Sequence, residues 1–196
     1  RAINAGISGH TTADGLSRID KDVLAHKPDI VTVMFGLNDM VRVSPADYRK
    51  NLITIVGRCR KIGAEVVLAT PNNVIDTPRR PTDRLVEYCD VVRSVGRDLD
   101  VPVCDCFRGY DAIRRHDRKD WRLLMSDQIH PNMDGHRRIA RQLARAITGR
   151  RVRLEHVHPT EPAIPRTLSL LKAGRPIRVL AMPPFDASIA GVLQKL

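Results

Sequence analysis

The alternation of short apolar runs with longer amphipathic segments is the sequence feature that most constrains the fold. Residues 30–35 and 65–70 are largely apolar, as expected of parallel strands that are covered on both faces. Between these runs, Leu52, Ile55 and Val56 recur at the spacing of one helix face. Strands that alternate with helices in this way predict an α/β fold, with a doubly wound parallel sheet in three α/β/α layers.

The remaining predicted elements continue this alternation. Residues 2–7 and 101–104 are predicted strands. Helical periodicity and capping residues predict helices at residues 12–27, 45–62, 82–98, 110–116 and 133–148. The irregular segment 71–81 has the composition of a loop over a site, and Trp121 is assigned to another loop.

The length and composition suit one α/β domain that needs no disulfides. The chain has 196 residues and 42% hydrophobic content, which is enough to bury a sizeable core. No apolar run approaches the roughly 20 residues of a membrane span. We therefore predict no membrane-spanning segment.

The net charge of +11 at pH 7 would suit a protein that binds nucleic acid. The basic residues are mostly Arg and are scattered over the predicted helix faces, and aromatic residues make up only 4% of the chain. We interpret the charge as solvated surface and predict no nucleic-acid partner.

The cysteines and most histidines show no pattern that is typical of a metal site. The four cysteines lack the paired spacing of zinc ligands, and Cys104 and Cys106 would point to opposite faces of a strand. His156 and His158 lack a third ligand nearby. We therefore predict ordinary thiols and no metal. The histidines that we interpret as surface or packing residues are His10, His26, His116 and His136.

Residues 126–132 place a carboxylate and an imidazole three residues apart, just before a predicted helix. On a turn, Asp127 can accept the Nδ1 proton of His130 and leave Nε2 free to take a proton from a nucleophile. Pro131 disfavours helical geometry at His130 and keeps its imidazole on an extended loop. The pattern is typical of the Asp and His of a hydrolytic triad. The alternative is a helix-capping aspartate beside a surface histidine.

Two further polar turns follow predicted strands. Gly9 lies in the turn after the first strand, and Asn38 lies in the turn after residues 30–35. From the local sequence alone, Gly9 is interpreted as an ordinary turn glycine and Asn38 as part of an Asx turn. Because ligands bind at the carboxyl ends of the strands in such sheets, the positions favour a site.

Three segments together resemble the SGNH, or GDSL-type, hydrolase family. They are residues 4–12, 36–39 and 127–132, which occur in the order and with the separations of the family. The resemblance covers about residues 1–149. It implies a flavodoxin-like sheet and serine-type hydrolysis of a small-molecule ester or thioester, without a metal or an organic cofactor.

The resemblance also implies a role for each candidate residue. Asp127 and His130 correspond to the triad Asp and His, and Gly9 and Asn38 correspond to the groups that stabilise the oxyanion. The family's first block is a Gly-Asp-Ser turn that supplies the nucleophile, and the chain has no counterpart of it before Arg1. We therefore expect a domain that is truncated at its N-terminus and lacks the first, central strand.

This departure leaves two hypotheses of function open. One is an acyl hydrolase whose given sequence lacks its own nucleophile. The other is a non-catalytic binding or interaction module that retains the fold.

Residues 150–196 differ in composition from the rest and are predicted to form a linker followed by a strand, a turn and a helix. The region is either the start of a second module or a replacement for the missing strand. Residues 177–182 have the apolar, β-rich character needed to fill the gap between the strands at 2–5 and 30–35. In that case Ser188, which follows them, is a candidate nucleophile.

Overall fold

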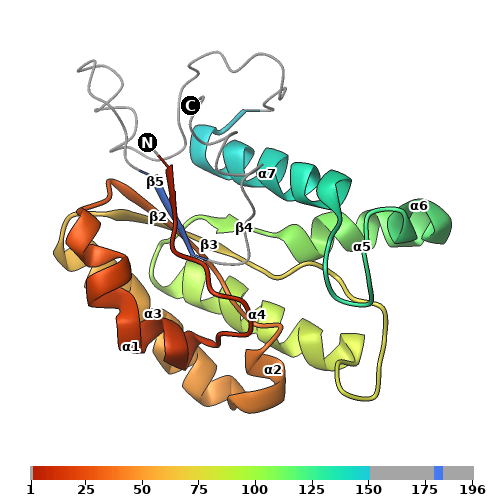
Figure 1. Cartoon of the computed structure of the whole chain (residues 1–196), viewed down its shortest axis with the longest axis horizontal. Helices are drawn as coiled ribbons and strands as arrows, with labels where there is room; N and C mark the ends of the chain where they lie inside the picture. The colour runs from red at the N-terminus through yellow and green to blue at the C-terminus, as the bar shows by residue number, and fades with distance from the viewer. Residues whose placement is uncertain (1, 151–178, 183–196) are drawn as a thin grey trace.

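In the part of the chain that the structure describes, five parallel strands form a central sheet (Figure 1). The computed structural model describes residues 2–150 and the backbone of residues 179–182. The order of the strands in the sheet is β1-β5-β2-β3-β4. Their bounds are Ala2–Asn4 for β1, Ile30–Met34 for β2, Glu65–Ala69 for β3, Val103–Cys104 for β4 and Val179–Met182 for β5. The predicted parallel α/β fold is confirmed.

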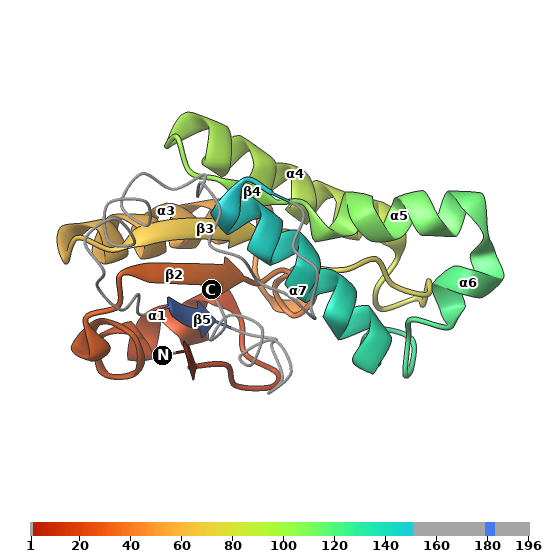
Figure 2. The ribbon, with the colours of Figure 1, turned by 90° about the horizontal axis from the view of Figure 1, so that it is seen from above.

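Helices cover both faces of the sheet (Figures 1 and 2). The bounds are Thr12–Asp22 for α1, Asp39–Arg42 for α2, Pro45–Lys61 for α3, Thr82–Asp98 for α4, Cys106–His116 for α5, Arg118–Arg122 for α6 and Met133–Thr148 for α7, and Leu24–His26 forms a 3-10 turn. Along β2, Val31 and Val33 pack into the core with α1, α3 and α4. Ile30 and Met34 point the other way and pack with α5 and α7. This alternation along a fully buried strand produces the three layers.

Local capping fixes where the first long helices begin, directly after the turns that carry polar residues. Thr11 and Asp14 form a capping box at α1: the Thr11 backbone N–H donates to Asp14 Oδ2 at 2.7 Å, and the Asp14 N–H donates to Thr11 Oγ1 at 3.4 Å. Ser44 caps α3 by accepting the Asp47 N–H at 3.1 Å, and Pro45 follows as the first helical residue. Both helix starts agree with the sequence prediction.

The region around β4 differs from the sequence prediction. The strand ends at Cys104, and α5 begins at Cys106 rather than near residue 110. Asp105 caps this helix by accepting the Arg108 N–H at 3.0 Å, which makes the change from strand to helix abrupt. The two thiols are consequently both buried, with their Sγ atoms 3.5 Å apart. Our prediction that they point to opposite faces of a strand was therefore wrong. The short helices α2 and α6 were also not predicted, and the assignment of Trp121 to a loop was wrong because this residue is buried in α6.

Residues 179–182 lie between β1 and β2 as strand β5 (Figure 1). Leu180 is in register with Ile3 of β1 and with Val31 of β2. This is the place expected for the apolar run at 177–182 under one of the two alternatives that the sequence leaves open, the replacement for the missing strand. The pairing gives ladder partners to the inner edges of β1 and β2, whose backbone groups would otherwise need another partner. The predicted linker, turn and terminal helix lie outside the described residues.

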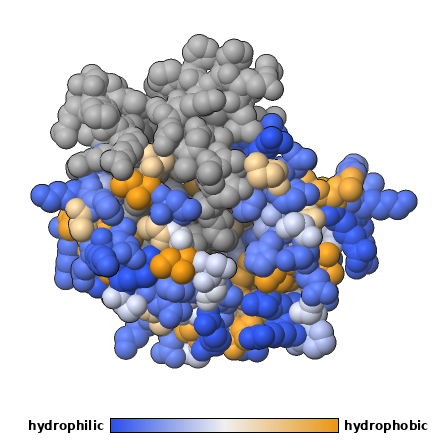
Figure 3. Space-filling view, in the orientation of Figure 1, coloured by the Kyte–Doolittle hydropathy of each residue, from blue (hydrophilic) through white to orange (hydrophobic). Residues whose placement is uncertain are grey.

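The described surface is largely hydrophilic in the view of Figure 3, and its hydrophobic residues occur in separate places. The large exposed hydrophobic residues come from different elements: Ile7, Ile53, Ile62, Leu123 and Met133. Within residues 2–150, no helix is both long and apolar enough to cross a membrane.

Leu180→Pro should destabilise the protein by about 1–3 kcal/mol, because proline in a central strand removes a ladder donor and leaves a carbonyl unpaired. Urea unfolding followed by circular dichroism measures the change. Leu180→Val is the matched control, since valine keeps the N–H group and suits a strand. An unchanged urea midpoint for Leu180→Pro would contradict the pairing of β5 in solution.

Candidate functional site

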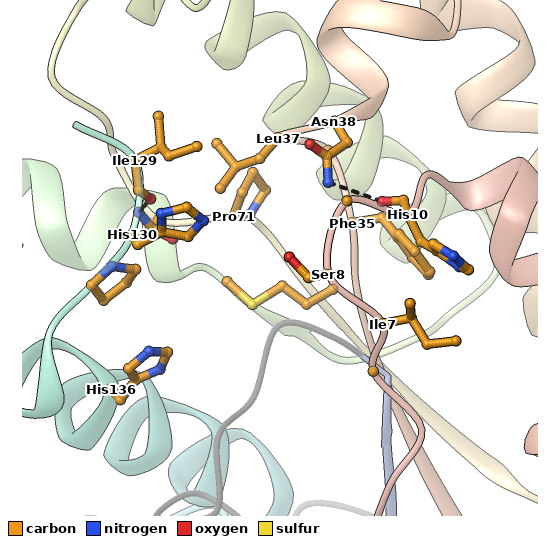
Figure 4. Close-up of a pocket in the computed structure, with 16 residues that line it drawn as sticks. Ile7, Ser8, His10, Phe35, Leu37, Asn38, Pro71, Ile129, His130 and His136 are labelled. Carbon is orange, nitrogen blue, oxygen red and sulfur yellow. Dashed lines mark hydrogen bonds between the residues drawn. The ribbon is translucent and has the colours of Figure 1, made fainter. Parts of the chain in front are cut away.

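A cleft of about 300 Å³ opens at the carboxyl ends of the strands (Figure 4). It is lined by segments that follow three different strands: 6–10 after β1, 34–38 at the end of β2, and 71–72 after β3. Residues 129–131, just before α7, complete the lining together with His136. The parallel sheet therefore brings together segments that lie more than a hundred residues apart in the sequence.

Asp127 and His130 form a hydrogen-bonded pair at this cleft. His130 Nδ1 lies 2.7 Å from Asp127 Oδ2. The other carboxylate oxygen, Oδ1, accepts the backbone N–H groups of Ile129 and His130, both at 2.7 Å. One oxygen thus closes the turn while the other holds the imidazole. The His130 ring points into the cleft (Figure 4), as the sequence pattern predicts for a base.

The same contacts explain the charge of Asp127. The hydrogen bond from His130 is the largest cause that lowers the pKa of Asp127 from 3.8 to about 2, with further contributions from the Ile129 and His130 backbone N–H groups. Asp127 is therefore ionised at neutral pH. An ionised carboxylate accepts only, so Nδ1 carries a proton toward Asp127, and in the neutral imidazole Nε2 is then the acceptor.

The alternative interpretation of Asp127 as a helix cap is wrong. Asn132 caps α7, because its Oδ1 accepts the N–H groups of Asp134 at 3.0 Å and of Gly135 at 3.1 Å. His130 lies before this cap, outside any helix or strand, and the next residue, Pro131, forms an isolated bridge with Met125. The imidazole is consequently carried by a loop and not by the helix.

Two hydrogen bonds connect the segment after β3 to the backbone of the Asp127–His130 turn. The Ile75 N–H donates to the Gln128 carbonyl at 2.8 Å. Asn72, which is fully buried, donates through Nδ2 to the Ile129 carbonyl at 3.1 Å. These bonds hold the backbone of the two residues that precede His130.

Gly9 and Asn38 line the cleft together with His130. Gly9 has a φ of 81°, a conformation that glycine adopts without strain, although a Cβ there would meet nothing within 4 Å. Asn38 donates from Nδ2 to the His10 carbonyl at 3.1 Å (Figure 4). Because a carboxamide has two N–H donors, a second one is available to an oxygen atom in the cleft. Asn38 makes no capping bond to α2, so the Asx-turn interpretation does not describe it.

Asp39 joins the two turns that carry Gly9 and Asn38. Its buried carboxylate accepts the Thr12 N–H at 2.8 Å, the Thr12 hydroxyl at 2.6 Å and the Gly36 N–H at 3.1 Å. Burial raises the pKa of Asp39, while the hydrogen bonds from Thr12 and Gly36 oppose that rise. The turn after β1 and the turn after β2 are therefore locked to one another through a single side chain.

Several residues of the cleft were not predicted as site residues. His10 and His136 were interpreted as surface or packing residues, yet both line the cleft. The His10 ring turns away from His130 (Figure 4) and accepts from Arg18 Nε through Nδ1 at 3.2 Å, whereas its carbonyl receives Asn38. Asn72 was not singled out either. Nothing in the local sequence marks these residues, because only the folding of the sheet brings them to the cleft.

Other sequence predictions concern residues with a different status. Ser188, His156 and His158 lie outside the described residues. Within the described part of the chain, no three His, Cys, Asp or Glu side chains are grouped so as to hold a metal ion. The four cysteines there are free and buried.

The fold and the cleft define the class of this protein. A three-layer α/β sheet that presents an Asp–His pair beside N–H donors, all at the carboxyl ends of its strands, is typical of hydrolases that use imidazole as a base. The family model described as GDSL-like Lipase/Acylhydrolase matches residues 1–138, and the chain belongs to this family. The resemblance predicted from the sequence is confirmed.

Individual relatives agree with this assignment. The chain is 28% identical over 159 residues to an acetylxylan esterase of Geobacillus stearothermophilus, and the match covers 75% of this chain and 72% of that protein. It is 27% identical over 146 residues to the thioesterase 1/protease 1/lysophospholipase L1 of Escherichia coli K12, which covers 74% of this chain and 66% of that protein. These relatives and the family make the chain an esterase-like hydrolase.

Solved structures show the same fold. A lipase/acylhydrolase from Enterococcus faecalis has a TM-score of 0.63 and 31% identity, over 74% of this chain and 75% of that one. The acetyl xylan esterase AlAXEase has a TM-score of 0.67 at 22% identity, over 72% of this chain and 78% of that one, and supports the fold alone.

The carboxyl carbon of Asp127, followed by NMR during an acid titration, should show a midpoint near pH 2, because the bond from His130 lowers its pKa to about 2. The folded state then binds this proton less readily than the unfolded chain. Stability from the pair should be complete above about pH 4 and be lost as the pH falls through about 2. In His130→Ala the midpoint should rise, since the main donor is absent. A wild-type midpoint near the ordinary value of 3.8 would contradict the bond.

Proposed function

We propose that this protein is a serine-type acyl hydrolase that cleaves a small-molecule ester or thioester. In this proposal His130 is the general base, Asp127 orients it, and Gly9 and Asn38 stabilise the oxyanion. The observation that carries the proposal is the 2.7 Å contact between His130 Nδ1 and Asp127 Oδ2, at a cleft that Gly9 and Asn38 also line.

In the proposed first half of the reaction, a serine is acylated. His130 Nε2 takes the proton of a serine hydroxyl while its oxygen attacks the acyl carbon, and the Asp127 carboxylate stabilises the imidazolium that forms. The acyl oxygen becomes negative and accepts from the Gly9 N–H and Asn38 Nδ2. A donor of this kind is typically worth about 3 kcal/mol of barrier. When the intermediate breaks down, the departing alcohol or thiol takes the proton from His130 and leaves the acyl group on the serine.

The second half repeats these steps with water. His130 removes a proton from a water molecule, which attacks the acyl-serine, and the same donors meet the second oxyanion. The serine oxygen then takes back the proton as the acid departs. No step requires a redox partner or an organic cofactor.

Strand β5 supports the proposal that Ser188 supplies the nucleophile. Met182, its last residue, is in register with Val33 of β2. Because the strands are parallel, the chain that follows Met182 starts at the edge of the sheet where the cleft opens. Ser188 is six residues further along the sequence, within reach of the cleft by chain length.

The second candidate function is a binding or interaction module that retains the cleft without catalysis. The observation that favours it is the sequence itself, because no Gly-Asp-Ser block occurs in the chain. Such a module would bind an ester or its product at the cleft and would not form an acyl-enzyme.

His130→Ala should lower kcat for hydrolysis of a short-chain nitrophenyl ester by about 10²–10⁴-fold, because the general base is lost. Release of nitrophenolate measures the rate. His116→Ala is the matched control, since His116 is an exposed histidine at the end of α5, and it should retain wild-type turnover. Undiminished turnover in His130→Ala would remove His130 from the mechanism.

A fluorophosphonate probe should label one serine of the protein, and labelling should depend on His130 because the hydroxyl must be deprotonated to attack phosphorus. Mass spectrometry of the labelled peptide identifies the serine. Loss of the label in Ser188→Ala, with labelling retained in the cleft variant Ser8→Ala, would assign the nucleophile to Ser188. A folded wild-type protein that takes up no label would contradict a nucleophilic serine within the given sequence.

A further inference from the structure

Arg80 lies behind Asn38, on the loop that follows β3. Its Nε donates to the Leu37 carbonyl at 3.1 Å, and one terminal nitrogen donates to Asn38 Oδ1 at 3.2 Å. One guanidinium therefore holds both the backbone and the side chain of the turn after β2. Arg80 was not recognised from the sequence, although its loop was predicted to lie over a site.

The contact decides which way the Asn38 carboxamide faces. A guanidinium can only donate hydrogen bonds, so the amide atom beside Arg80 has to be the oxygen. The amide nitrogen is then directed to the opposite side, where it donates to the His10 carbonyl at 3.1 Å. With Oδ1 and Nδ2 both engaged on fixed partners, the flipped orientation would place N–H groups against the cation and an oxygen against a carbonyl. The remaining N–H of Asn38 therefore has a defined direction.

The loop is built to hold Arg80 in place. The Arg80 N–H donates to the carbonyl and to the hydroxyl of Thr77, both at 3.0 Å, and the two residues form an isolated antiparallel bridge. Thr82, two residues further on, donates its backbone N–H to Asp76 Oδ1 at 2.6 Å. The cation is thus carried by a closed turn rather than by a free loop.

Arg80 differs from the described arginines that pair with carboxylates. Examples of such pairs are Arg18 with Asp22, Arg49 with Asp98, Arg93 with Asp105 and Arg137 with Asp134. Arg80 is half-buried and bonds instead to the neutral oxygens of Leu37 and Asn38. Burial, followed by the charges of Arg79 and Arg42, lowers its pKa. Burial therefore disfavours the charged form of Arg80. Because the donors that bond to Leu37 and Asn38 contact no carboxylate of the described residues, the positive charge is not neutralised there and can stabilise an anion that forms nearby.

We propose that Arg80 is a positioning residue for the oxyanion site: it fixes the orientation of the Asn38 carboxamide and polarises it, so that Nδ2 becomes a stronger donor. The inference rests on the proposed role of Asn38. A hydrogen bond from a cation to Oδ1 draws electron density from the amide nitrogen, as in a chain of bonds that strengthen one another. The effect should act on the transition state, where the acyl oxygen is charged, and little on the bound substrate.

The first measurement is independent of activity. The side-chain N–H₂ signals of Asn38 in a ¹H–¹⁵N spectrum are assigned by their absence in Asn38→Ala. In the wild-type protein they should be shifted by hydrogen bonding and exchange slowly with water. In Arg80→Met both signals should move toward those of a free carboxamide, and exchange should be faster by about tenfold or more. Arg79→Met, which removes the neighbouring exposed charge, should leave them unchanged. Unchanged signals in Arg80→Met, or equal changes in Arg79→Met, would overturn the proposal.

The second measurement is kinetic. With a nitrophenyl ester, Arg80→Met should lower kcat by about 10- to 100-fold at nearly constant KM, which is less than the about 10²–10³-fold loss expected from deleting the donor in Asn38→Ala. Arg80→Lys keeps the charge but offers a point donor in place of the planar fork, so its kcat should lie between those of the wild type and Arg80→Met. A rise in KM with kcat unchanged would overturn the proposal. Absence of all hydrolysis by the wild type would contradict a nucleophile within the given sequence, while the amide signals would still decide the role of Arg80.

Discussion

Parallel pairing of the strands is the constraint on which the rest of this structure depends. Strands that all run the same way must be connected by crossovers, so that helices cover both faces and every carboxyl end meets one edge of the sheet. The turns at residues 6–10, 34–38 and 71–72 follow β1, β2 and β3 to that edge and there line a single cleft. The position of the site is thus a property of the sheet, before any side chain is considered.

Two carboxylates near this edge show how environment separates structural from chemical roles. Asp39 is buried, and its three hydrogen bonds to Thr12 and Gly36 hold two turns together while burial raises its pKa. Asp127 is more exposed, and the bond from His130 lowers its pKa to about 2. Asp39 is a buried acceptor whose hydrogen bonds come from two segments, so its role is to hold these segments together. Asp127 is an ionised carboxylate that accepts a hydrogen bond from an imidazole, which is the arrangement that orients a histidine base.

Hydrogen bonds between the turns, rather than the turns themselves, determine the geometry of the site. Asn38 donates to the turn after β1, and Arg80, from the loop after β3, donates to Asn38 in the turn after β2. Asn72 donates to the chain before α7. Each of these side chains bonds a carbonyl or carboxamide oxygen on a different segment. The cleft is consequently held by cross-links around its rim, and a substitution behind the rim can alter chemistry at its centre.

The sequence by itself determined the class of fold and the identity of the principal polar groups. Continuous apolar runs, helical periodicity and caps such as Ser44 and Thr11 are local signals, and they predicted the strands, most helices and the parallel sheet. The Asp127–His130 contact is also local, since it spans three residues of one turn. The catalytic roles of Asp127, His130, Gly9 and Asn38 stay proposals.

Only the tertiary structure decided which distant groups share the cleft. The contacts of Arg80, Asn72 and Asp39 join segments separated by 42, 57 and 27 residues, and no local periodicity encodes such pairs. The place of β5 between β1 and β2 was one of two alternatives that the sequence left open, and its register appears only in the folded sheet. Sequence patterns report how each segment folds against a generic core, whereas the directions of side chains at the rim depend on how the segments are packed together.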